Sequence, residues 1–154
     1  MSDRIAVLAA GKVHQIAAPR EIYHRPATAF VARFIGNSNV LSATVLSVND
    51  GGVRLRLDGG GELDVPASPS VDAVVGTGVQ VSIRPEQLSF GTASECILAG
   101  VVKSLEFTGA SLNYEVECGP ETLTVTVPDS VDAPREGDAV NLVCGRNKAW
   151  MVQP

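Results

Sequence analysis

The chain of 154 residues is 45% hydrophobic, 19% charged and only 5% aromatic, and its 15 glycines and nine prolines imply many turns. This composition is typical of a β-rich protein whose core is built from Val, Leu and Ile. The net charge of −5 is uneven, because residues 1–36 hold five basic and two acidic residues, which leaves seven basic and 15 acidic residues in the remainder. An acidic barrel repels phosphate backbones, which argues against general nucleic-acid binding.

Cysteine and histidine give no sign of a metal or redox site. Cys96, Cys118 and Cys144 form no CxxC pair, so we expect the buried, reduced thiols of a cytosolic protein. His14 and His24 lack a ligand partner at helical spacing and are expected to be surface or packing residues. The chain begins without a basic-then-apolar signal sequence, and no apolar run approaches the ~18 residues that span a bilayer. We predict no catalytic residue, no cofactor and no metal.

The first elements along the chain are a hairpin and two short helices. Residues 5–8 and 13–16 are apolar runs around a turn, and such a hairpin must pack on other elements to be stable. Helices are predicted over 19–24 and 27–35, with prolines at their starts and Gly36 as a C-cap. The second helix carries an apolar stripe made of two i,i+4 pairs, Phe30/Phe34 and Val31/Ile35.

After the polar hinge Asn37-Ser38-Asn39, every predicted element is a strand or a turn. Turn signals rich in glycine separate the strands, and alternating apolar and polar residues indicate antiparallel sheets with one buried face. The predicted strands are 41–48, 53–58, 62–66, 79–84, 97–107, 111–118, 121–127, 139–144 and 148–152.

This β region repeats itself. Three pairs of segments align: 43–45 with 99–101, 63–66 with 125–128, and 78–83 with 137–142. Five strands per half is the size of a small barrel of the oligonucleotide/oligosaccharide-binding (OB) type. We therefore predict a mainly β fold, a duplicated OB-like antiparallel barrel whose halves lie side by side or intertwined, preceded by the hairpin and the two short helices.

The strand at 79–84 runs into Arg84-Pro85-Glu86, where proline fixes the backbone and bends the chain. Val79, Val81 and Ile83 are predicted on one face and the polar residues on the other, which leaves an exposed Arg–Glu corner. The second half has no Arg-Pro-Glu at the corresponding place. Two interpretations follow: a contact surface, or a structural corner at which Arg84 and Glu86 pair locally.

Several motifs in the first 41 residues lie in an order known from one family: SDRI at 2–5, EIY at 21–23, FVA at 30–32 and FIG at 34–36. In this order they resemble the end of the nucleotide-binding domain of the ABC ATPases that serve periplasmic binding-protein importers. Residues 41–154, with VSIRPE at 81–86, resemble the TOBE domain, an OB-like and MOP-like regulatory domain that follows in that family. The resemblance implies a nucleotide-binding-domain remnant at 1–38 and a regulatory domain at 39–154, with repeats of about 41–90 and 97–154.

The ATPase motifs of that family are missing from this sequence. Its one Gly-Lys, Gly11-Lys12, is followed by Val13 and does not form the P-loop G-x-x-x-x-G-K-[ST]. No LSGGQ-like signature and no Walker B strand are present, and in the family the switch histidine lies just before the SDRI motif. We therefore expect the C-terminal part of such an ATPase, not an enzyme by itself, with ATP and Mg²⁺ bound only by a full-length parent.

The resemblance implies a non-catalytic regulatory and dimerisation domain of an importer's ATP-binding subunit. Such a subunit is cytoplasmic and peripheral to the inner membrane, and its partners are membrane permease subunits and its own nucleotide-binding domain. We expect a homodimer without nucleic acid and without direct membrane insertion, and partial exposure of the Phe30/Phe34 stripe favours self-association. Arg84, Pro85 and Glu86 are the candidate dimer or regulator contacts.

Two other functions are weighed against this one. Duplicated domains of this shape resemble molybdate-binding domains, in which an oxyanion lies between subunits, but the Ser-Ala-Arg-Asn entry motif is absent and the region near 92–95 carries an acid. Nucleic-acid binding needs a basic groove with stacking aromatics. The barrel region has only four aromatic residues, and Trp150 is predicted to pack in the core.

Overall fold

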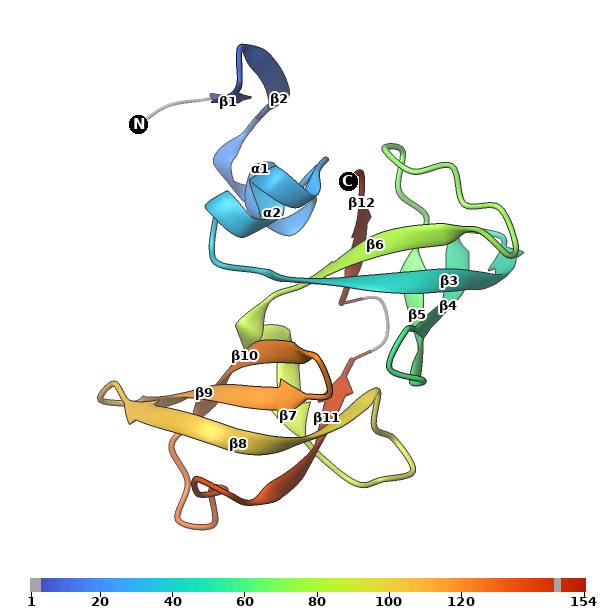
Figure 1. Ribbon diagram of the computed structural model, residues 1–154. Coiled ribbons are helices and arrows are strands. Elements are labelled where there is room, and N and C mark those ends of the chain that lie inside the picture. Colours follow the sequence, from blue (N-terminus) through green and yellow to red (C-terminus); the bar gives the residue numbers. More distant parts are fainter. Residues whose placement is uncertain (1–3, 146–147) are drawn as a thin grey trace.

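The computed structural model describes residues 4–145 and 148–154 (Figure 1). The predicted hairpin and two helices are present, and the fold is mainly β as predicted. The elements are β1 Ile5–Ala9, β2 Lys12–Ala17, α1 Pro19–His24, α2 Ala29–Phe34, β3 Asn39–Asn49, β4 Gly52–Leu57, β5 Glu62–Pro66, β6 Gly78–Ile83, the 3₁₀ turn η1 Pro85–Gln87, β7 Leu88–Phe90, β8 Leu98–Phe107, β9 Ser111–Cys118, β10 Glu121–Pro128, β11 Ala139–Cys144 and β12 Trp150–Val152.

Two five-stranded antiparallel sheets share one strand order. The first sheet runs β12-β6-β3-β4-β5 and the second β7-β11-β8-β9-β10. Each sheet takes one edge strand from the other repeat. β7 follows β6 in the chain but pairs with β11, and β12 follows β11 but pairs with β6. The repeats are therefore intertwined. Figure 1 shows the hairpin and helices at one end of the molecule, the first sheet in the middle and the second sheet at the other end.

The sheets confirm the repeat but correct the predicted alignment. Backbone bonds join Val45 to residues 76 and 77, and the same bonds join Val102 to residues 137 and 138. Val45 therefore corresponds to Val102, and Gly76, rather than Gly78, corresponds to Gly137. The sequence alignment was wrong by one residue in the first strand and by two later. The two-residue error arises because residues two apart share a face and give the same apolar pattern.

The main core is one continuous cluster of buried apolar side chains that draws on both sheets and both repeats. Val45, Leu55 and Val81 of the first sheet and Val116 and Leu142 of the second are at most 1% exposed. Tyr114, also buried, donates from its hydroxyl to the Pro134 carbonyl at 2.7 Å, so its polar atom is satisfied at the edge of the core.

The helices cover the outer face of the first sheet, over β6 and β12. Ala29 and Ala32 of α2 pack with Trp150, which is buried as predicted, but in a separate cluster beneath the helices and not in the main core. Val31 is also fully buried, contrary to the idea that the whole α2 stripe is exposed, whereas Phe30 and Phe34 are 38% and 68% exposed and stack at 5.6 Å.

Candidate functional site

The end of β6 is covered on both faces, which changes the predicted exposed corner. Val81 and Ile83 point into the core, as predicted. Ser82 and Arg84, expected on the wet face, are only 3% exposed, because the two short helices lie over that face. For Arg84 the expectation of exposure was therefore wrong.

Arg84 binds backbone carbonyl oxygens of both helices. Its Nε donates to the Tyr23 carbonyl at 3.2 Å, and Nη2 donates to the same oxygen. Nη1 donates to the Ala32 carbonyl at 3.1 Å and to the Ile35 carbonyl. These carbonyls lie at the ends of α1 and α2, where a helix leaves acceptors without internal partners and its dipole favours a cation. One guanidinium thus fixes the ends of both helices to the barrel.

Two further groups shape this junction. The Tyr23 ring lies under the Arg84 guanidinium, 4.3 Å from its centroid, in a cation–π contact. Gly36, with φ of +88°, passes so close that a β-carbon there would lie 2.7 Å from Arg84 Nη1. Desolvation by the surrounding chain lowers the pKa of Arg84, while Tyr23 and Glu86 oppose that shift.

Pro85 and Glu86 have different surroundings from Arg84. Pro85 is buried as the first residue of η1, and the Gln87 side chain accepts a bond from the Arg84 backbone N–H at 2.8 Å. Glu86 is exposed and its carboxylate accepts a hydrogen bond from the Tyr23 hydroxyl, which raises the pKa of Tyr23. Of the three candidate contact residues, only Glu86 thus presents its side chain at the surface, and a contact with a partner stays a prediction.

Sequence reasoning found Arg84 but not what it binds. Tyr23 contributes a ring and a carbonyl that no spacing rule connects to a residue 61 positions later. Gly36 was recognised as a helix C-cap, and its positive φ confirms that role, but its closeness to Arg84 depends on the packing of α2 onto β6.

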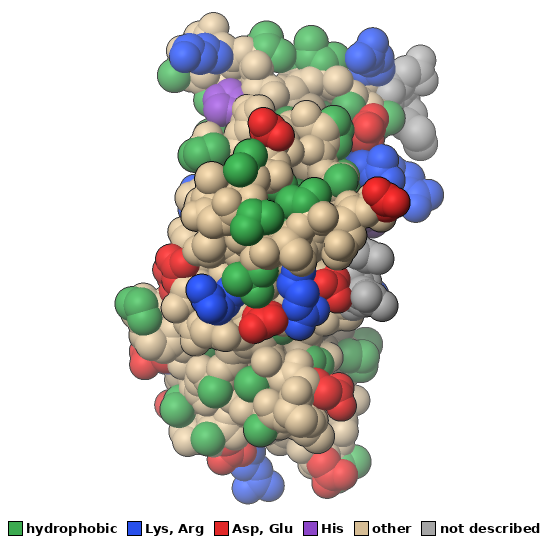
Figure 2. Space-filling view, turned by 90° about the vertical axis from the view of Figure 1, so that its right-hand side faces the viewer, with side chains coloured by type: hydrophobic (Ala, Val, Ile, Leu, Met, Phe, Trp, Pro, Cys, Tyr) green, Lys and Arg blue, Asp and Glu red, His purple; other side chains and the backbone are tan. Residues whose placement is uncertain are grey.

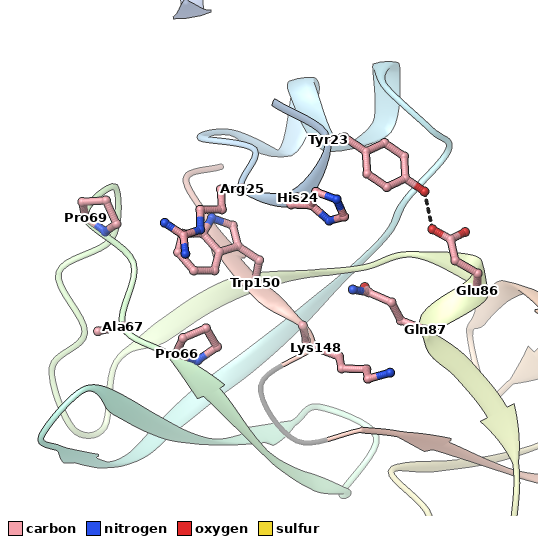
Figure 3. A pocket seen from close by; sticks show the side chains of 11 residues that line it. Tyr23, His24, Arg25, Pro66, Ala67, Pro69, Glu86, Gln87, Lys148 and Trp150 are labelled. Atoms are coloured by element: carbon pink, nitrogen blue, oxygen red, sulfur yellow. Dashed lines mark hydrogen bonds between the residues drawn. The ribbon is translucent and has the colours of Figure 1, made fainter. Parts of the chain in front are cut away.

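A cleft of about 680 Å³ opens beside the junction, between α1, η1 and the start of β12 (Figure 3). His24 and Arg25 project from the α1 side, and Gln87 and Lys148 lie across from them. Trp150 forms part of the wall, with the Arg25 guanidinium 5.4 Å from its ring centroid. This cleft, called the α1 cleft below, joins the helical segment to the barrel.

Comparison with known proteins places this geometry in a family. Residues 81–151, from the middle of β6 to β12, match the TOBE domain family. The spermidine/putrescine import ATP-binding protein PotA of Pseudomonas fluorescens is 42% identical over 134 residues, 86% of this chain and 36% of that protein. PotA of Thermobifida fusca is 34% identical over 155 residues, 98% of this chain and 38% of that protein. Over most of its length the chain is therefore homologous to part of the ATP-binding subunits of ABC importers, and residues 81–151 carry a TOBE domain.

The relatives are much longer than this chain. The chain spans about a third of the length of these curated relatives and corresponds to a C-terminal segment of such subunits. Among solved structures, the cytoplasmic molybdate-binding protein ModG with molybdate bound matches 75% of this chain and 96% of its own, with a TM-score of 0.64 and 19% identity. That likeness confirms the OB-type fold. Within the described part of the chain, the helices are all too short or too polar to cross a membrane.

Proposed function

We propose that this chain is the non-catalytic regulatory and dimerising domain of the ATP-binding subunit of a binding-protein-dependent ABC importer. The TOBE match and the PotA relatives support the family, and the chain's own sequence lacks the P-loop, signature and Walker B motifs. In this proposal residues 1–38 belong to the nucleotide-binding domain and residues 39–154 to the regulatory domain. ATP and Mg²⁺ are bound only by the longer subunit.

The Arg84 junction is the observation that carries the regulatory role. A rigid connection between a regulatory domain and an ATPase transmits a movement of one to the other, whereas a loose linker would absorb it. Here one buried side chain holds the ends of both helices, and the neighbouring Glu86 carboxylate holds the Tyr23 hydroxyl. A displacement of the helical segment is therefore carried to β6, the strand that lies between β3 and β12 in the first sheet.

The surroundings of the whole subunit follow from the same proposal. Membrane permease subunits and the nucleotide-binding domain are its partners, and it lies in the cytoplasm at the inner membrane. The relatives named above import spermidine and putrescine, and we extend that cargo class to this protein. On the face that Figure 2 shows, basic and acidic side chains are intermixed rather than gathered into the basic stripe of a nucleic-acid binder. Arg54 of β4 also forms ion pairs with Glu62 and Asp64 of β5.

Dimerisation is tested by light scattering on the isolated chain at about 100 µM, where a dimer is expected. Two surfaces offer exposed apolar side chains: α2, with Phe34 at 68% exposure, and the end of β8, with Phe107 at 59%. We expect Phe34→Ser to shift the mass toward the monomer and the matched Phe107→Ser to leave it unchanged. A monomeric wild-type chain contradicts the dimerising role, and the opposite response of the two variants moves the interface to β8.

The non-catalytic assignment has a separate test. The chain is incubated with ATP and Mg²⁺, and phosphate release is followed. We expect no release above the protein-free blank, and a rate that scales with chain concentration and survives repurification contradicts the assignment. Oxyanion binding between subunits is not carried further, because the likeness to ModG shows the fold alone.

A further inference from the structure

The α1 cleft has an excess of hydrogen-bond donors and positive charge. Arg25 and Lys148 line it as cations, and no ion pair among the described residues includes either of them. The one acidic side chain in its wall, Glu86, is engaged by the Tyr23 hydroxyl at one end of the cleft (Figure 3). A local positive site in a chain of net charge −5 stands out from its surroundings, and such a site attracts anions.

Two neutral donors in the wall have no acceptor. Gln87 accepts the Arg84 backbone N–H with its Oε1, so its Nε2 is directed away from that contact, and it finds no acceptor in the described part of the chain. Trp150 is 9% exposed, and its indole Nε1 is buried without a hydrogen-bond partner among the residues described. Gln87 is partly exposed, so its amide can donate to a ligand in the cleft, whereas the Trp150 Nε1 is covered by the protein and Trp150 offers a ligand only its ring.

The opposite wall is apolar and gives the ligand a second requirement. Pro66 and Pro69 border the cleft beside the Trp150 ring. The volume of about 680 Å³ lies within the usual range of small-molecule sites, which combine apolar walls with a few convergent polar groups. A ligand that fits both walls has an anionic head and a compact apolar body.

We infer that the α1 cleft binds a small organic anion, with a carboxylate or phosphate-type head at Lys148 and Gln87 and an apolar body against Trp150 and Pro66. His24 and Arg25, at the end of α1, border the same cleft, so a bound ligand lies between the helical segment and the barrel. Binding itself does not depend on the proposed transport function. Its consequence is that the ligand strengthens the connection already made by Arg84.

The test uses the fluorescence of Trp150, the single tryptophan of the chain, together with calorimetry. The probes are cyclohexanecarboxylate and cyclohexylphosphonate, which share a body and differ in the head, and neutral cyclohexanol serves as the control, all at one ionic strength. We expect a saturable response to at least one anion with a Kd near or below about 1 mM, and no saturation with cyclohexanol. The head group that binds more tightly identifies the class of the natural ligand.

Variants separate a specific site from general charge attraction. Lys148 and Lys103 are both exposed lysines, and Lys103 lies on β8, away from the cleft. Lys148→Gln is expected to weaken binding by about tenfold, the value of one charged hydrogen bond, and Lys103→Gln to change it less than about twofold. The proposal is overturned by the absence of saturation with both anions up to about 20 mM, by equal binding of cyclohexanol, or by equal effects of the two lysine variants.

Discussion

The two sheets have the same strand order but end differently at the corner after their second strand. Their pairing makes Ile83 of β6 equivalent to Cys144 of β11, so that Arg84 corresponds to Gly145. At the first corner a buried arginine holds two helices, whereas at the second corner Gly145 is exposed and packs under the Lys148 stem. Duplication thus supplies the same scaffold twice, and only the first copy combines a buried arginine with the helical cover that it holds.

The largest expected effect comes from removing that side chain. Arg84→Met keeps much of the volume but removes the guanidinium donors from the carbonyls of Tyr23 and Ile35, and leaves the Ala32 carbonyl with only its bond from the Ser38 N–H. We expect the free energy of unfolding, measured in urea, to fall by about 3–5 kcal/mol. Arg84→Lys is expected to recover only part of this loss, because an ammonium cannot present the planar set of donors that reaches both helices.

Arg56 provides the control for this prediction. It is exposed on β4 of the same sheet, so Arg56→Met removes the same charge without uncovering buried carbonyls. Its effect on unfolding is expected to be within about 0.5 kcal/mol. If the two methionine variants destabilise equally, the loss at Arg84 reflects net charge, and the first corner is no different from the second.

A smaller effect is expected at Gly36, where the chain passes beside the guanidinium. Gly36→Ala both strains a left-handed backbone and places a methyl group 2.7 Å from Arg84 Nη1 and 3.0 Å from the Tyr23 ring. We expect thermal and urea unfolding to show a loss of about 2–3 kcal/mol.

Gly76 and Gly137, one in each repeat, isolate the backbone contribution. Their φ angles of +87° and +89° match that of Gly36, but a β-carbon at either would meet no atom within 4 Å. Alanine at either position is expected to lower the free energy of unfolding by about 1–2 kcal/mol, which is the cost of the left-handed backbone without any clash. Equal losses at all three glycines contradict a tight contact between Gly36 and Arg84.

Most of the fold was predictable from the sequence because the signals are local. Alternation of apolar residues placed the strands, and glycines and prolines placed the turns and helix ends. The exchange of β7 and β12 was not predictable, because β7 is only three residues long and its pairing with β11 is chosen by packing across the whole barrel.

The candidate site shows the same limit. The Arg84-Pro85-Glu86 corner was identified, but pattern alone assigned Arg84 to a wet face. A strand alternates relative to its own sheet, and nothing in that period says whether a helix covers the second face. The residues that bury Arg84 lie more than 45 positions earlier in the chain, so their contribution is visible only in the folded molecule.

The smallest expected effect concerns Cys144, the counterpart of the fully buried Ile83. Burial raises the pKa of Cys144 from 9.0 to about 11, with Lys148 opposing the shift. The folded chain therefore holds this proton more tightly than the unfolded chain, so the associated stability is complete below pH 9 and is lost as the pH rises toward 11. Between pH 8 and pH 10 this group alone should lower the free energy of unfolding by about 1 kcal/mol.

Cys144→Val measures that contribution, because valine resembles the aliphatic residue at the equivalent position of the first sheet and cannot ionise. Tyr23, Tyr114 and Cys118 also have raised pKa values, so both proteins lose stability in alkali. The difference between them isolates Cys144: urea unfolding at pH 8 and pH 10 should show a loss smaller by about 1 kcal/mol in the variant. Equal losses in both proteins would mean that the Cys144 thiol ionises as freely in the folded chain as in the unfolded chain. The second corner would then be more open to solvent than the structure shows, and the difference in burial from Ile83 at the first corner would be larger.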